Sequence, residues 1–109
     1  MRAPDNEAAK LMQEKIKELQ AAGNSAGGII ECVIKNCPVG VGEPVFDKLD
    51  AELAKAMLSI GAIKGFEIGD GFDVATATGL SNNDAFCIKD GKISKRTNHS
   101  GGTLGGFSD

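Results

Sequence analysis

Glycine is distributed unevenly along this chain, and its distribution restricts the fold more than any other feature. Ten of the 15 glycines lie from Gly61 onward, so the second half is rich in turns and in backbone conformations that other residues avoid. The 109 residues suit one small domain with a modest hydrophobic core. We therefore expect a single domain over residues 1–109 whose second half is rich in turns.

The beginning of the chain predicts a helix followed by a strand. Asp5 is a good N-cap, apolar residues recur at helical spacing after it, and Gly23 suits the end of the helix. The run 27–35 is β-branched and predicts a strand, which Pro38 ends.

The middle of the chain predicts a second helix and a second strand. Pro44 suits the first turn of a helix, and apolar side chains recur on one face as far as Ile60, with charged side chains on the other. Residues 61–68 then predict a strand, whereas residues 72–83 indicate an irregular loop.

The last third of the chain predicts a β-hairpin and then a glycine-rich loop. Residues 85–88 and 92–95 flank Asp90-Gly91, which supplies the positive φ angles of a tight turn. Residues 97–109 complete no element, so we expect a truncated loop there. The order helix, strand, helix, strand, hairpin predicts an α+β fold, with two helices packed on one face of an antiparallel sheet.

Composition and charge exclude several classes of protein. The formal net charge is −3 and no long basic run occurs, so nothing favours binding to nucleic acid. No segment is long and apolar enough to predict a membrane span, and the first ten residues do not resemble a signal peptide. Three cysteines, an odd number, favour a reducing cytoplasm over a disulfide framework.

Two glycine-rich loops are candidates for ligand binding. Gly40-Val41-Gly42 precedes a predicted helix, but a tight strand-to-helix turn is favoured because Glu43 would repel an anion. Residues 98–106 are the better candidate, since four glycines expose backbone amides beside hydrogen-bonding side chains. From spacing alone, a ligand-binding loop and a flexible tail remain equally open.

The remaining polar residues predict no catalytic or metal site. His99 is the only histidine and has no matched acid or nucleophile near it in the sequence, so a solvent-exposed loop histidine is favoured. Cys32 and Cys87 alternate with apolar residues and are expected in the core, and zinc is not expected. Three aspartates that do not fit a calcium loop are interpreted as turn-forming residues: Asp70, Asp73 and Asp84.

Three stretches of the sequence resemble one enzyme family, in the same order. The run PVGVGEPVFDKLDAELAKAMLSIGAIKGFEIGDGF, which begins at Pro38, is similar to the central segment of chorismate synthase almost residue for residue. The upstream stretch 23–28 and the closing run 98–106 also match family motifs. Residues 72–96 resemble the family more loosely. The resemblance covers essentially all of the chain from Pro4 onward.

The resemblance implies a fold and a reaction. Members of the family build a β-α-α-β sandwich and convert 5-enolpyruvylshikimate 3-phosphate to chorismate in the shikimate pathway of aromatic amino acid biosynthesis. They do so by 1,4-elimination of phosphate and require reduced FMN without net redox change. This would make the parent protein a cytoplasmic lyase acting on a phosphorylated small molecule, typically a homotetramer. The resemblance also implies a link to NADP, and the sequence leaves open whether the enzyme reduces its own flavin.

A few site residues carry over by position. Gly61 and Ala62 match a pair that approaches the flavin, although Gly61 stands where Pro or Asn is common. Gly105 matches another flavin contact, and Asn98 matches a polar residue near flavin and substrate. His99 stands where the family varies between His and Asn, so no catalytic residue is assigned.

The resemblance also implies parts that these 109 residues lack. Two essential histidines and most substrate-binding arginines of the family lie upstream, and a Lys-Pro-Thr-Ser-Ser flavin motif and a late aspartate lie downstream. We therefore expect an internal fragment that is inactive alone and has the rest of the enzyme chain as its partner. The alternative is a stand-alone α+β module that self-associates without catalysis.

Overall fold

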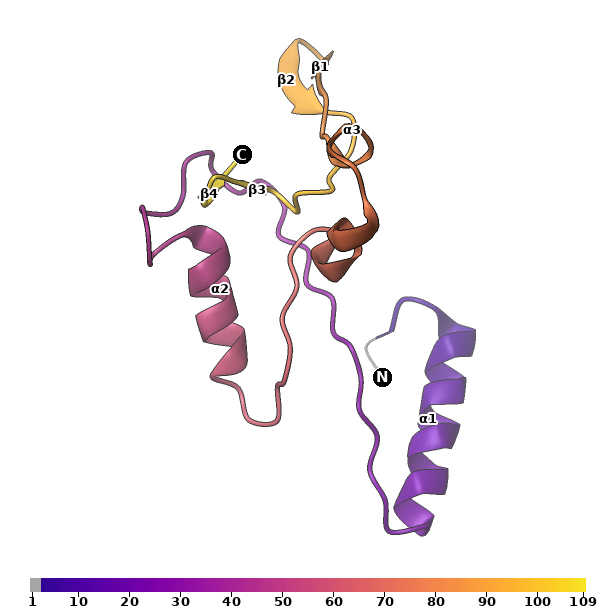
Figure 1. Ribbon diagram of the computed structural model, residues 1–109. Helices are drawn as coiled ribbons and strands as arrows, with labels where there is room; N and C mark the ends of the chain where they lie inside the picture. Colours follow the sequence, from indigo (N-terminus) through magenta and orange to yellow (C-terminus); the bar gives the residue numbers. More distant parts are fainter. Residues whose placement is uncertain (1–2) are drawn as a thin grey trace. The chain divides into compact units, whose positions relative to one another are not determined.

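The computed structural model describes residues 3–109, which divide into two compact units (Figure 1). The first unit ends at Val33 and the second runs from Ile34 to Asp109. A single domain over the whole chain stays a prediction.

The first unit contains one helix, α1 (Asn6–Ala21), with well-formed ends. The Asp5 carboxylate accepts hydrogen bonds from the amides of Glu7 and Ala8 at 2.8 and 3.1 Å, so it caps the helix as the sequence predicts. At the other end Gly23 has φ 65°, and the amides of Gly23 and Asn24 bind the carbonyls of Gln20 and Leu19. This is a Schellman motif, and it confirms Gly23 as the residue that ends the helix.

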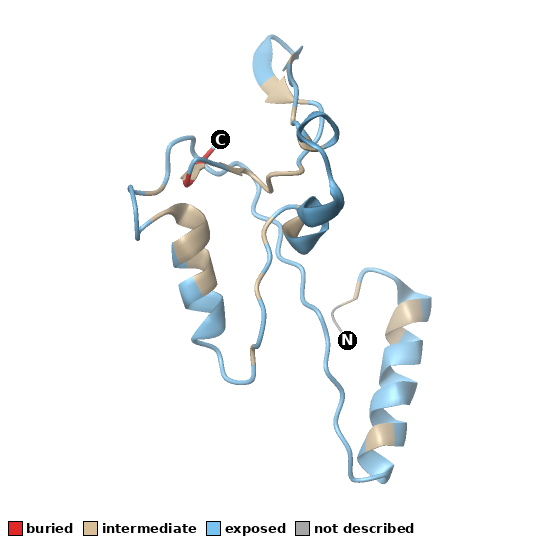
Figure 2. Cartoon of the chain, in the orientation of Figure 1, coloured by how far each residue is buried: buried red, intermediate tan, exposed pale blue. Residues whose placement is uncertain are grey.

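The predicted strand over residues 27–35 is absent. This segment forms no ladder with any described residue and is exposed along its length; Ile29 is 99% exposed (Figure 2). A β-branched sequence favours extended backbone, but a strand exists only where a second segment pairs with it. The prediction that Cys32 lies in a core is wrong for the same reason, since this thiol is exposed.

The second unit begins with a loop that leads into helix α2 (Leu49–Leu58). The helix starts five residues later than predicted, because Val45 adopts φ 67° in a turn and Pro44 lies in the bend before it. Lys48 is the N-cap without a side-chain bond, and the Leu49 amide instead donates to the carbonyl of Gly106 at 2.8 Å. A distant loop thus caps this helix.

Residues after α2 differ from prediction in two places. Residues 61–68 form no strand, since no described segment pairs with them. The segment expected to be an irregular loop contains a 3-10 helix, η1 (Gly71–Thr76), and a short helix, α3 (Gly79–Asn82). Thr78 and Ser81 form a capping box at the start of α3.

Two antiparallel hairpins complete the second unit. Strands β1 (Phe86–Lys89) and β2 (Lys92–Lys95) pair around Asp90 and Gly91, whose φ angles are 52° and 73°, and this confirms the predicted hairpin. Cys87 in β1 is partly exposed, so it is not a core residue as predicted. Strands β3 (Thr103–Leu104) and β4 (Phe107–Ser108) form a second hairpin that the sequence analysis missed.

Helices and small antiparallel sheets confirm the α+β class, but the predicted order and the predicted larger sheet do not form. Residues 3–109 include no buried hydrophobic side chain, and Ser108 is buried at 3% exposure (Figure 2). The described helices include none long and apolar enough to cross a membrane.

Candidate functional site

Asp84 holds the beginning of the glycine-rich loop. Its Oδ1 accepts hydrogen bonds from the Thr97 hydroxyl at 2.7 Å and from the His99 amide at 2.8 Å, and its Oδ2 accepts from the Ser100 amide at 2.9 Å. The bond from the Ser100 amide, together with those from Thr97 and His99, holds the pKa of Asp84 far below its usual range. Asp84 was interpreted as a turn-forming residue, whereas its side chain binds residues 13 to 16 positions away.

Asp70 binds the same loop from a different segment. Its Oδ2 lies 2.6 Å from His99 Nδ1, and its amide donates to the His99 carbonyl at 2.8 Å. His99 therefore has an acidic partner that sequence spacing did not reveal, and its side chain is partly covered rather than free in solvent. The pair lies at a surface, with side-chain exposures of 31% for His99 and 40% for Asp70.

The backbones of Gly69 and Gly101 touch beside this pair. A Cβ built on Gly69 would collide with the His99 carbonyl oxygen, and one built on Gly101 would collide with the Gly69 amide. Both glycines have positive φ angles, of 59° and 68°. Glycine is therefore required on both sides of this contact by space as well as by conformation.

Ser108, in β4, joins the loop Gly40-Val41-Gly42 to the end of the chain. Its hydroxyl donates to the Pro38 carbonyl and accepts from the Val41 amide at 2.7 Å, and its backbone pairs with Gly40 and Val41. A Cβ on Gly42 would lie 2.5 Å from the Gly106 carbonyl oxygen. The Gly40-Val41-Gly42 loop is thus bonded to β4, and the absence of a side chain at Gly42 permits its close approach to Gly106.

The residues expected to contact flavin lie at the two ends of α2. Gly105 is in the β3–β4 turn, whose neighbour Gly106 caps the first residue of the helix, whereas Gly61 and Ala62 follow the last turn (Figure 1). Ten helical residues at a rise of about 1.5 Å each separate the two ends by roughly 15 Å. The structure therefore does not bring Gly61 and Gly105 together.

Each of these positions is open to a flat ligand. No atom lies within 4 Å of a Cβ built on Gly61 or Gly105. Ala62 has φ 69°, a conformation that costs energy in a residue with a side chain and that is often found at functional sites. The side chain of Asn98 forms no hydrogen bond with any residue the structure describes, so it is available to a ligand.

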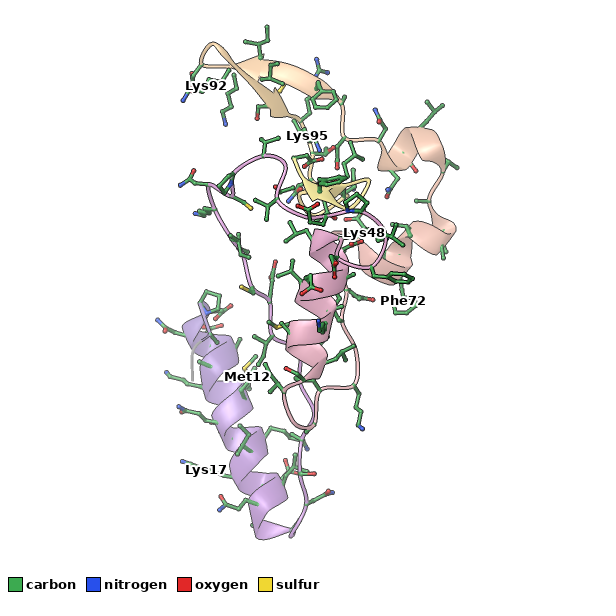
Figure 3. The ribbon with its side chains drawn as sticks, turned by 90° about the vertical axis from the view of Figure 1, so that its left-hand side faces the viewer. Met12, Lys17, Lys48, Phe72, Lys92 and Lys95 are labelled. Carbon is green, nitrogen blue, oxygen red and sulfur yellow. The ribbon has the colours of Figure 1, made fainter. Side chains whose placement is uncertain are left out.

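An open cavity of about 520 Å³ lies beside the loop held by Asp84. Its lining residues include Ser100 and Asn82, whose buried hydroxyl and side-chain carbonyl oxygens have no hydrogen-bond partner among the described residues. Phe72 and Lys48 also line the cavity and are labelled in Figure 3. The remaining lining residues come from α2, η1, the segment between them and the loop 98–106: Asp50, Ala51, Ala54, Phe66, Glu67, Ile68, Gly71, Val74 and His99.

Comparison with known proteins places the chain in one family. The sequence model of the chorismate synthase family matches residues 1–109. Curated chorismate synthases from Agathobacter rectalis and Methanosarcina mazei are 63% and 55% identical over 97% and 99% of this chain. A crystal structure of chorismate synthase superposes over 99% of this chain and 33% of its own, with a TM-score of 0.83 and 32% identity.

The chain spans about 30% of the length of those curated relatives, 29% for Agathobacter rectalis and 30% for Methanosarcina mazei. The match includes the segments that form the geometry above: the loop held by Asp84 and Asp70, helix α2 and the hairpin that caps it. On this sequence and structural agreement, the chain belongs to the chorismate synthase family.

Proposed function

We propose that these residues form part of the active-site wall of an enzyme that converts 5-enolpyruvylshikimate 3-phosphate to chorismate by eliminating phosphate. The observation that carries the proposal is the family match over residues 1–109. The geometry supports it, because the polar loop that begins at Asn98 is fixed by two carboxylates while the Asn98 side chain itself is left unused.

Reduced FMN is the cofactor that fits this proposal. The open backbones of Gly61 and Gly105 and the small side chain of Ala62 would let a planar ring approach closely. When bound, the flavin supplies electron density for phosphate departure and takes part in proton removal. Because α2 separates the two groups of small residues, each group acts as a separate point of contact.

Asn98 is the residue of this chain proposed to contact substrate. Its amide offers two donors and one acceptor, which suits the oxygens of a phosphorylated, carboxylated substrate. Arg96 and Arg2 are the only arginines in the sequence, too few to bind a phosphate and several carboxylates by paired hydrogen bonds. We therefore propose that the remaining cationic groups come from the rest of an enzyme chain and that these 109 residues alone are inactive.

The cellular location and the oligomeric state that we propose are those that the resemblance to the family implies. We propose a cytoplasmic, homo-oligomeric enzyme, with a homotetramer as the expected state. Participation of NADP in reducing the flavin stays a prediction.

A chimaera tests the proposed function. The 106 matching residues of the Agathobacter rectalis chorismate synthase are replaced by this chain, which is 63% identical to them. We expect the chimaera to form chorismate from 5-enolpyruvylshikimate 3-phosphate with reduced FMN, and the isolated 109 residues to form none. A folded chimaera without turnover would contradict the proposal, and so would robust turnover by the isolated chain.

A second candidate function is self-association without catalysis, and the exposed apolar residues favour it. Phe46 is 85% exposed, Leu80 is 96% exposed and Ile29 is almost fully exposed. Such surfaces commonly become covered by another protein surface. Sedimentation of the isolated chain should then show oligomers at high concentration, whereas a clean monomer would reject this candidate.

A further inference from the structure

The side chain of Asp84 makes all its hydrogen bonds with one short stretch of the chain, residues 97–100. Asp84 lies between α3 and β1, and its three hydrogen bonds go to Thr97, His99 and Ser100. A local turn or helix cap would bind donors within a few residues, whereas these partners lie 13, 15 and 16 positions away. The carboxylate therefore fixes a distant loop and does not form its own turn.

The three donors surround Asn98 in the sequence. Thr97 precedes it and His99 and Ser100 follow it, so a side-chain hydroxyl before Asn98 and two backbone amides after it bind the same carboxylate. The side chain of Asn98 makes no hydrogen bond among residues 3–109 and takes no part in holding the loop. The fold thus fixes the position of Asn98 and leaves its amide free.

Asp70 limits the movement that the loop retains. Its two hydrogen bonds with His99 and the backbone contact between Gly69 and Gly101 hold residues 99–101 from a second segment of the chain. A shift of the loop would have to break bonds to both carboxylates. The position of the Asn98 backbone is therefore set by its neighbours.

We propose that Asp84 is a positioning residue for Asn98, holding it where it contacts the substrate and flavin of the proposed reaction. The inference rests on the proposed function and adds a residue with no ligand contact of its own. Only a carboxylate satisfies all three donors, because an amide in its place would turn an N–H donor toward at least one of them.

The test is a double-substitution cycle in the chimaera. Asp84→Asn should lower kcat/KM by roughly tenfold or more, about the effect of losing a hydrogen bond to a charged group. Asn98→Ala should also lower kcat/KM. When both are combined, the loss should exceed that of Asn98→Ala alone by no more than about twofold, because Asp84 acts through Asn98.

The matched control is Asp73→Asn, which removes the same charge from an exposed side chain that forms no hydrogen bond within the described residues. It should leave kcat/KM unchanged. Unchanged kcat/KM in Asp84→Asn would overturn the inference, and so would multiplication of the two losses in the double variant or an ineffective Asn98→Ala. A wholly inactive chimaera instead rejects the proposed function, so the two failures are distinguishable.

A milder variant keeps the test decisive if Asp84→Asn does not fold. Thr97→Val removes one of the three hydrogen bonds and retains the carboxylate. It should give a smaller loss of kcat/KM that again disappears in the Asn98→Ala background. A Thr97→Val loss that persists in that background would overturn the inference.

Discussion

At the scale of single residues, the loop 97–101 is shaped by two carboxylates from other parts of the chain and by a contact between its own Gly101 and the distant Gly69. The carboxylates supply the hydrogen bonds, and the glycines allow the backbones at Gly69 and Gly101 to touch. Neither contribution replaces the other, because bonds of 2.6 to 2.9 Å require the close approach that the glycines permit.

Gly69→Ala should destabilise the protein. The new Cβ would collide with the His99 carbonyl, and φ at this position is 59°. Strain of this kind costs on the order of 1–3 kcal/mol, and the collision adds to it. Urea unfolding of the chimaera measures the effect, with Gly79→Ala as control because that position is open and not at positive φ. Equal stability of the two variants would contradict this account.

The stabilisation contributed by Asp84 should depend on pH. The pKa of Asp84 is lowered in the folded protein, whereas an unfolded aspartate titrates near about 3.9. Its contribution is therefore complete above that value and is lost as the pH falls further toward the folded pKa. The difference in free energy of unfolding between the chimaera and its Asp84→Asn variant should be constant at neutral pH and shrink below about pH 4. A difference that grows on acidification would refute this assignment.

At the scale of elements, those determined by neighbouring residues could be predicted from the sequence, whereas those that depend on distant residues could not. Helix α1 and the β1–β2 hairpin could be predicted, because Asp5, Gly23 and Asp90-Gly91 act on their immediate neighbours. Helix α2 begins later than the sequence pattern indicates, because Val45 has a positive φ angle, and its cap comes from Gly106, more than fifty residues downstream.

Asp5→Ala should reduce the helix content of a peptide covering residues 3–26. The substitution removes both side-chain hydrogen bonds of the N-cap, which are worth about 1 kcal/mol in a helix of this kind. Circular dichroism measures the loss. Glu14→Ala serves as control, since Glu14 is exposed and caps nothing, and it should preserve or raise helicity. A peptide unaffected by Asp5→Ala would show that the cap does not contribute.

Strand pairing and the supports of the candidate site could not be predicted from the sequence. Residues 27–35 and 61–68 have strand composition, but pairing depends on a partner that no local pattern specifies. The loop from Asn98 was identified as a candidate from its glycines and polar groups. Asp84 and Asp70 were missed as its supports, because their contacts with His99 join positions 15 and 29 residues apart.

At the scale of the whole molecule, these residues bury little apolar surface. Without buried hydrophobic side chains within residues 3–109, the main stabilising term of folding is small.

The isolated chain should therefore unfold gradually on heating, whereas the chimaera should show a cooperative transition. Differential scanning calorimetry distinguishes the two at low protein concentration. A sharp, concentration-independent transition in the isolated chain would show that these residues form a core of their own.

The hydrogen bonds of Ser108 also determine an order of events during synthesis. The Val41 amide is translated 67 residues before its partner hydroxyl on Ser108. The Leu49 amide, the first of α2, is likewise translated well before its partner, the Gly106 carbonyl. Until Gly106 and Ser108 leave the ribosome, the start of α2 and the loop at Pro38 lack the groups that fix them. Closing so long a loop has an entropic cost that rises only slowly with its length. A nascent chain that ends before Gly106 should therefore carry a frayed α2, and residues 106–108 complete this region in one late step.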